Sequence, residues 1–69
     1  MCLITVFMEN DGEKREVMQQ VAYIEAKDDG FLIVGLLGER KFVQGRIKHL
    51  DFIRDHSAVL EPPGVGGGS

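Results

Sequence analysis

Apolar residues along the first sixty positions fall into short runs separated by polar turns, which is the pattern of a β-protein. The first run, residues 2–8, is rich in β-branched and aromatic side chains and stops at Asn10-Asp11-Gly12, a strong hairpin-turn signal. Alternating residues of a strand point to opposite faces, and in this run both faces are largely apolar. This is typical of a strand covered on both sides. The pattern therefore predicts a strand over residues 2–8.

The most hydrophobic run, residues 31–37, follows the turn signal Asp28-Asp29-Gly30 and is predicted to be a central strand. Gly45 interrupts a strand that would otherwise continue to Leu50, and a glycine in a strand pattern indicates a bulge or a corner. The other predicted strands cover residues 13–17, 21–27, 40–43 with its continuation past Gly45, and 58–61.

Residues 13–27 also admit a second interpretation. Met18-Gln19-Gln20 suits a single helical turn. For a longer helix, partial helical spacing is found at Val17, Gln20, Val21 and Ile24. A helix over residues 13–27 is the alternative, and the strand interpretation is preferred.

Six short strands separated by turns predict an all-β fold, an antiparallel meander. Curvature at Gly45 would let this sheet roll into a small β-barrel, an arrangement that removes exposed sheet edges. We expect one domain over residues 1–61. Residues 62–69 have the Pro/Gly-rich composition of a flexible tail.

Length and composition narrow the function. A 69-residue chain with one cysteine cannot form a disulfide within the monomer, so a metal or self-association is the expected support. Eight basic and eleven acidic residues give a net charge of −3, opposite to that expected of a dedicated nucleic-acid binder. No apolar run reaches membrane-spanning length and no signal peptide is visible, so we expect a soluble, cytoplasmic protein with no membrane partner.

The one cysteine, Cys2, directly follows Met1. A thiolate at this position can share a metal ion with the N-terminal amine and the intervening amide nitrogen, closing two five-membered chelate rings. Sulfur and nitrogen donors in one plane suit Ni(II) or Cu(II). The alternative is structural, because a single free cysteine usually behaves as a small buried hydrophobe.

Other candidate residues carry weaker signals. Single-strand RNA binders interleave basic and aromatic residues, and a similar cluster here consists of Arg40, Lys41, Phe42, Arg46 and Lys48. His49 and His56 lie at no standard zinc spacing and are candidate auxiliary ligands. The aspartates at positions 28, 29, 51 and 55 are expected to serve turn backbones. Nothing indicates an enzyme, since so small a chain has little room for a desolvated cleft.

Several segments together resemble the CooT family, small proteins named for a nickel-binding accessory of carbon monoxide dehydrogenase maturation, whose domain has also been labelled as RNA-binding. The similarity extends over residues 1–61. The segments that carry it are Met1-Cys2-Leu3, the Asp11-Gly12 hairpin, Val17-Met18, residues 21–25, Asp29-Gly30, residues 36–41 and Gly45-Arg46-Ile47.

The resemblance implies a homodimer of small Sm-like or SH3-like β-barrels that binds Ni(II) through Cys2 and works with nickel-enzyme maturation machinery. The thiolates of two Cys2 residues, or Cys2 with the Met1 amine, would complete the nickel site, and the sequence does not choose between them. Two alternatives remain open. One is an RNA-binding module, and the other is a metal-independent interaction domain that uses exposed apolar residues such as Leu3 and Phe7.

Overall fold

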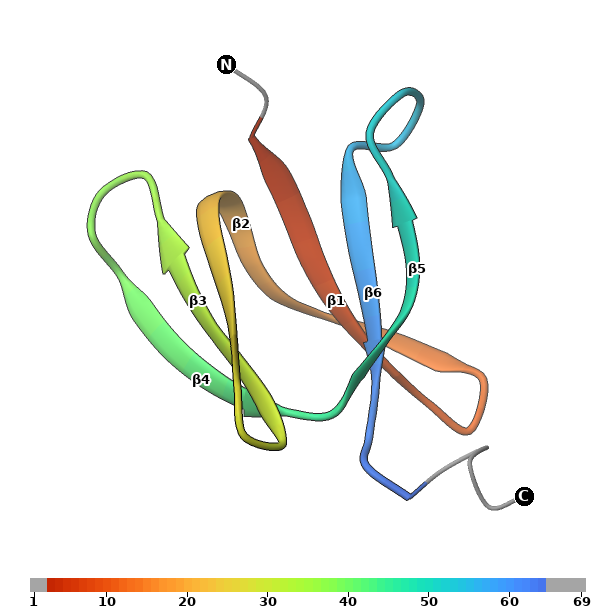
Figure 1. The fold of residues 1–69 in the computed structure, drawn as a ribbon. Helices are drawn as coiled ribbons and strands as arrows, with labels where there is room; N and C mark the ends of the chain where they lie inside the picture. Colours follow the sequence, from red (N-terminus) through yellow and green to blue (C-terminus); the bar gives the residue numbers. More distant parts are fainter. Residues whose placement is uncertain (1–2, 65–69) are drawn as a thin grey trace.

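The computed structural model describes residues 3–64, which form an all-β structure of six strands (Figure 1). Within this part of the chain there is no helix, and so none that could span a membrane. The strands are β1 (Ile4–Asn10), β2 (Glu13–Lys27), β3 (Gly30–Gly35), β4 (Arg40–Gln44), β5 (Arg46–Asp51) and β6 (Ser57–Glu61).

One sheet contains all six strands in the order β4-β3-β2-β1-β6-β5. Neighbouring strands are antiparallel except β1 and β6, which run parallel, with Thr5 opposite Ser57 and Met8 opposite Leu60. The predicted antiparallel meander is therefore wrong at this pair. The second strand of the β5–β6 hairpin lies beside β1. Strand β1 is therefore paired on both of its edges, with β2 on one and β6 on the other.

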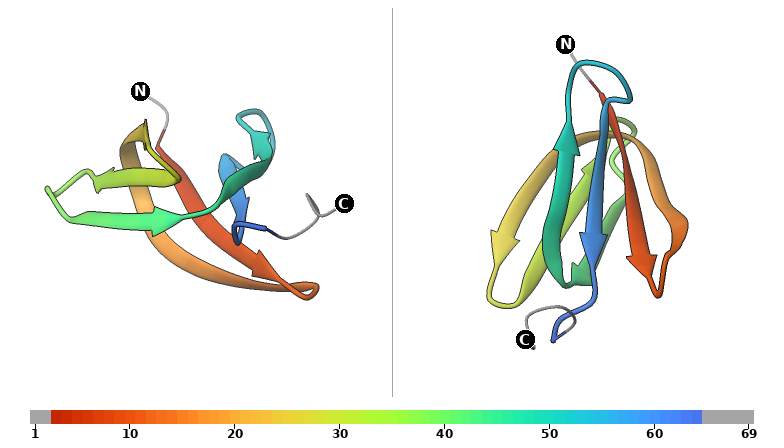
Figure 2. Two further views of the ribbon diagram at one scale, coloured as in Figure 1. Left: turned by 60° about the horizontal axis from the view of Figure 1, so that its bottom comes forward. Right: turned by 90° about the vertical axis from the view of Figure 1, so that its right-hand side faces the viewer.

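The predicted closed barrel is also wrong, because β4 and β5 are the two edges of an open sheet. The chain does turn a corner at Gly45, as the sequence predicts: its φ is 146°, and its N–H donates to the Asp29 carbonyl at 3.0 Å. From this corner β4 and β5 diverge, so the sheet is strongly curved but its edges do not pair (Figures 1 and 2).

The segment from residue 13 to residue 27 is one long strand, so the helical turn and the alternative helix predicted there are both wrong. Gln20 adopts a φ of 51°, and the pairing with β1 shifts register near Val6. These irregularities bend β2, so that its first half pairs with β1 and its second half with β3. The Gln20 carbonyl accepts a hydrogen bond from the Leu36 N–H at 2.9 Å, which fixes the bend.

The core joins strands β1, β2, β3 and β6 of the curved sheet. Val6, Ile33 and Leu60 are its largest fully buried side chains, contributed by β1, β3 and β6. Around them pack Ile4, Val21, Ala58, Met8, Val17, Met18, Ile24, Phe31 and Val43. Residues far apart in the chain therefore hold the sheet in its curved form.

The sheet has two ends of different character (Figure 1). We call the first the N-terminal end: it holds the start of β1, the β3–β4 turn at residues 36–39 and the β5–β6 turn at residues 52–56. The other, the hairpin end, holds the β1–β2 turn at residues 11–12, the β2–β3 turn at residues 28–29 and Gly45.

Candidate functional site

The two residues expected to bind metal, Met1 and Cys2, lie outside the described residues, so the chemistry predicted for them stays a prediction. The start of β1, one residue further along the chain, is described. The Thr5 N–H donates to the His56 carbonyl at 3.0 Å, and Thr5 pairs with Ser57 across the parallel ladder. The start of β1 is therefore held against the β5–β6 turn.

The β5–β6 turn is ordered by Asp51. Its Oδ1 accepts hydrogen bonds from the Ile53 and Arg54 N–H groups, both at 2.9 Å. These two bonds hold the pKa of the Asp51 carboxyl below its ordinary value, because they favour the charged form. The turn presents Phe52 and Ile53 to solvent, and Ile53 is 87% exposed. The expectation that this aspartate serves the backbone is confirmed.

The β3–β4 turn at the same end is built in a similar way. Glu39 Oε1 accepts from the Leu37 N–H at 3.1 Å, while the Glu39 carbonyl accepts from the Gly35 N–H at 2.8 Å. Leu37 is 83% exposed. The predicted strand over residues 31–37 is thus two residues too long, because β3 ends at Gly35 and Leu36-Leu37 enter the turn.

An apolar groove of about 210 Å³ lies between the bend of β2 and the β5–β6 turn. Ile4 and Phe52 contribute to it from β1 and from the turn. The remaining lining residues belong to β2 and are Val21, Ala22, Tyr23 and Ile24. We refer to this feature as the apolar groove.

Tyr23, at one wall of the groove, donates its hydroxyl to Glu25 Oε1 at 3.2 Å. This hydrogen bond, together with the negative charge of Glu25, raises the pKa of Tyr23. The Tyr23 hydroxyl acts here as a hydrogen-bond donor.

The two histidines predicted as auxiliary ligands are separated by the β5–β6 turn. His49 lies on β5 opposite Val59, and His56 ends the turn with a φ of 50°. Among residues 3–64, no three side chains of His, Cys, Asp or Glu gather into a group able to hold a metal ion. Of the two histidines, His56 is the one whose backbone contacts β1 near its start.

The basic residues proposed for RNA binding fall into two groups on the opposite edges of the sheet. Arg40, Lys41 and Phe42 belong to β4, while Arg46 and Lys48 belong to β5. The Phe42 ring lies over Gly30, where an added Cβ would come 2.8 Å from its Cζ. Lys48 is engaged by Glu9, with Nζ and Oε2 2.9 Å apart.

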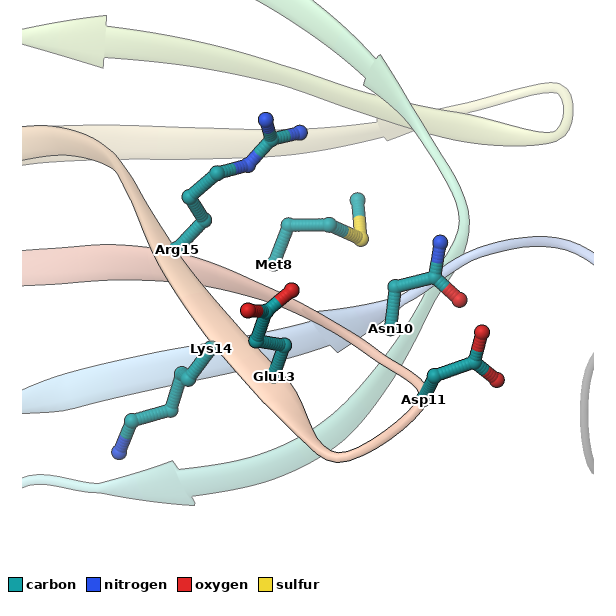
Figure 3. Close-up of a pocket in the computed structure, with 6 residues that line it drawn as sticks. All are labelled: Met8, Asn10, Asp11, Glu13, Lys14 and Arg15. Carbon is teal, nitrogen blue, oxygen red and sulfur yellow. The ribbon is translucent and has the colours of Figure 1, made fainter.

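A further pocket of about 410 Å³, not singled out by the sequence, lies at the β1–β2 hairpin (Figure 3). Charged side chains of both signs line it, together with a thioether and an amide, from Met8, Asn10, Asp11, Glu13, Lys14 and Arg15. The turn signal at Asn10-Asp11-Gly12 marks its position in the sequence. This pocket is at the hairpin end, away from the start of β1.

Taken together, these features define a small all-β protein with one open, curved sheet and ordered apolar turns beside the start of its first strand. The chain belongs to the CooT family: the family model described as CO dehydrogenase accessory protein CooT matches residues 1–61. This confirms the resemblance inferred from the sequence.

Comparison with solved structures supports the same family. A crystal structure assigned to CooT from Carboxydothermus hydrogenoformans superimposes with a TM-score of 0.82 at 26% identity, covering 88% of this chain and 97% of that one. No curated protein matches the chain. The fold and the family are therefore those of a CO dehydrogenase accessory protein, and the family name describes no catalytic activity.

Proposed function

We propose that this protein binds Ni(II) as a homodimer and supports the maturation of a nickel enzyme, with the Cys2 thiolate as its principal ligand. The observation that carries the proposal is the family match, which extends over residues 1–61 and so includes Cys2, to a description as a CO dehydrogenase accessory protein. Nickel is the cargo in this account, captured and released rather than used in a reaction.

The donor set suits that cargo. The Cys2 thiolate offers soft sulfur, and the Met1 amine and the Cys2 amide offer nitrogen donors in the same plane, a combination that favours Ni(II) or Cu(II) over hard cations. Metal binding displaces the thiol proton, so nickel affinity should fall as the pH is lowered. A fall in pH would therefore release the nickel ion.

His56 is the auxiliary donor to examine first. Its carbonyl accepts from Thr5 N–H, three residues after Cys2, whereas His49 lies within β5. A neutral imidazole is a good ligand for nickel. His49→Ala therefore serves as the matched control for His56→Ala.

The test is a titration of Ni(II) into the reduced protein, followed by the ultraviolet thiolate-to-metal charge-transfer band. We expect a saturable band in the wild type that Cys2→Ala removes without changing the circular dichroism spectrum. A dipeptide added ahead of Met1 tests the amine separately: if it leaves the affinity unchanged, the amine is not a ligand. Nickel binding of equal affinity in Cys2→Ala would overturn the proposal.

The nucleic-acid alternative has less support. The basic residues of β4 and β5 lie on opposite edges of the sheet, and the Lys48 charge is offset by Glu9. An RNA-binding surface predicts affinity that falls linearly with the logarithm of salt concentration. A gel shift of single-stranded RNA at low salt, compared with Arg40→Ala, tests it.

A further inference from the structure

The two edge strands of the sheet differ in how they are protected from other strands. β5 pairs with β6 through a register shift between Ile47 and His49, and an irregularity of this kind twists an edge away from a partner. Its Lys48 is also held by Glu9 at 2.9 Å. β4 pairs with β3 over all 5 of its residues with no register shift, and it contains no proline. β4 is therefore the more regular edge.

The backbone groups that β4 presents outward follow from two hydrogen bonds that continue its pairing with β3. The Gly35 N–H donates to the Glu39 carbonyl at 2.8 Å, and the Gly45 N–H donates to the Asp29 carbonyl at 3.0 Å. In an antiparallel ladder, pairs that exchange hydrogen bonds alternate with pairs that do not. Hydrogen bonds at residues 39 and 45 therefore imply hydrogen bonds to β3 at residues 41 and 43. The N–H and C=O groups that point away from β3 are those of residues 40, 42 and 44.

The side chains of this edge carry charge of one sign. Arg40 and Lys41 are exposed, and β4 contains no acidic residue. Among residues 3–64, neither side chain forms an ion pair. The adjacent Glu39 accepts from the Leu37 N–H and lies over Gly35, where an added Cβ would come 3.0 Å from its Cδ. The positive charge of the edge is therefore available to a partner.

Apolar surface accompanies this charge. Phe42 is 48% exposed, and Leu32, directly opposite it on β3, is only partly buried. Arg40 and Phe42 share one face of the strand, because alternate residues of a strand point to the same side. A further strand laid along β4 would cover part of the Phe42 ring and continue this face.

We propose that β4 accepts an extended acidic segment of another protein as an added antiparallel strand. In this mode of recognition, main-chain hydrogen bonds supply affinity and alternate side chains supply specificity. Acidic side chains of the segment would lie opposite Arg40 and Lys41, and an aliphatic side chain would lie opposite Phe42. The proposal goes beyond nickel binding and does not depend on it.

Two other occupants fit this edge less well. Two copies of the chain joined along β4 would concentrate the positive charge of Arg40 and Lys41, and lysine on an edge strand is a common device against such self-pairing. A nucleic acid would use the same charge, but a regular row of outward N–H and C=O groups matches a peptide backbone. An acidic strand satisfies both the charge and the backbone.

The probe is a synthetic peptide, Thr-Val-Ile-Glu-Glu, blocked at both ends and titrated into the isotope-labelled full chain without metal. In antiparallel pairing its threonine lies opposite Gln44, its isoleucine opposite Phe42 and its last glutamate opposite Arg40. We expect the amide NMR signals of these three residues to shift more than those of Lys41 and Val43, because their N–H groups face the added strand. The matched peptide Thr-Val-Ile-Lys-Lys should not bind.

Methylation of the peptide backbone separates strand pairing from charge attraction. Methylation of the isoleucine amide removes the N–H that would donate to the Phe42 carbonyl, and should weaken binding about tenfold. Methylation of the valine amide is the control, because that N–H would point away from β4, and it should have little effect. The charge of the peptide is the same in both cases.

Charge reversal on the protein tests the other half of the proposal. Arg40→Glu should bind the glutamate peptide several-fold more weakly and the lysine peptide more tightly. Arg54→Glu is the matched control, because it changes the net charge by the same amount in the exposed β5–β6 turn, and it should bind like the wild type. Circular dichroism of each variant verifies the fold.

The contrary outcomes are distinct. The proposal would be overturned by β4 amide signals that do not move at the highest soluble peptide concentration, by equal effects of the two methylations, or by equal weakening in Arg40→Glu and Arg54→Glu. Displacement of the peptide by oligouridylate, with no sensitivity to methylation, would also overturn it and assign the edge to nucleic acid. Every measurement is made without nickel, so a failed nickel titration would leave this proposal standing.

Discussion

The two ends of this sheet differ in how their turns are held and in the side chains that those turns carry. At the N-terminal end, Asp51 and Glu39 accept hydrogen bonds from turn backbones whose neighbouring side chains are apolar and exposed, Ile53 and Leu37 among them. At the hairpin end, the turns at residues 10–12 and 28–30 contain Asn, Asp and Gly with no exposed apolar residue. A turn does not need apolar side chains to form.

The contrast concerns how closely the backbones pack at each end. The hairpin end brings backbones close together: a Cβ on Gly45 would collide with the Glu61 carbonyl, and one on Gly30 with the Val43 carbonyl. The turns of the N-terminal end present side chains that the core does not use. Substitutions of the close-packed glycines at the hairpin end should therefore cost more stability than substitutions in the turns of the N-terminal end.

The largest expected effect is at Gly45. Gly45→Ala should lower the free energy of unfolding by about 3 kcal/mol or more, because the φ of 146° is strained for alanine and the new Cβ overlaps the Glu61 carbonyl. That is a large share of the roughly 3–10 kcal/mol expected for a chain of this length. Urea unfolding measures it.

Gly12→Ala is the control, because Gly12 also has a positive φ, 79°, but nothing within 4 Å of an added Cβ. Its cost should be about 1 kcal/mol, the conformational part alone. Equal losses at the two glycines would show that the collision at the corner is not what matters.

An intermediate effect is expected at Glu39. Glu39→Ala removes the side-chain bond to the Leu37 N–H and should destabilise the chain by about 1 kcal/mol. Glu39→Gln retains an acceptor oxygen and should recover most of the loss in the same unfolding experiment. Equal losses in Glu39→Ala and Glu39→Gln would show that the side-chain hydrogen bond does not stabilise this turn.

Asp51 should stabilise the β5–β6 turn. Asp51→Ala removes the acceptor for two backbone N–H groups of this turn and should lower the midpoint of urea unfolding. Asp51→Asn, which keeps one acceptor oxygen, should be closer to the wild type. An unchanged unfolding midpoint in Asp51→Ala would mean that these two hydrogen bonds do not contribute to stability.

The same residue predicts a pH dependence. Since the pKa of Asp51 is lowered in the folded state, its stabilising contribution is complete above the unfolded pKa, about 3.9, and is lost as the pH falls through the lower folded value. The free energy of unfolding of the wild type should fall in that acidic window. Asp51→Ala should lack this component, and identical pH profiles for the two proteins would contradict the assignment.

The smallest effect is expected at the ion pair between β5 and β1. The Lys48–Glu9 pair is partly exposed, with side chains 46% and 25% accessible, so Lys48→Met should change the unfolding free energy by about 0.5 kcal/mol or less. Addition of salt should reduce the difference further. A loss above about 1 kcal/mol would mean that this pair stabilises the β5–β6–β1 packing far more than surface pairs usually do.

Local features of the fold could be predicted from the sequence, and long-range ones could not. The Asn10-Asp11-Gly12 turn and the Gly45 corner were predictable because each depends on backbone preferences of a few adjacent residues. The parallel pairing of β1 with β6 and the open sheet depend on contacts between opposite ends of the chain, which alternation of apolar residues does not encode.

The candidate site was predictable only in part. Chemistry singled out Cys2, yet the apolar turns beside the start of β1 were missed. Leu36-Leu37 extended an apolar run and resembled the end of a strand, and Phe52-Ile53 lay between strand patterns without a turn signal of their own. Their exposure depends on where β3 and β5 end, which the tertiary structure decides.

Native mass spectrometry of the reduced full chain with Ni(II) tests the central claim most directly, because one spectrum reports both chain number and bound nickel. The account predicts a wild-type dimer that carries nickel and a Cys2→Ala dimer that carries none. Nickel retained by the Cys2→Ala dimer, or a wild type that takes up nickel only as a monomer, would contradict it.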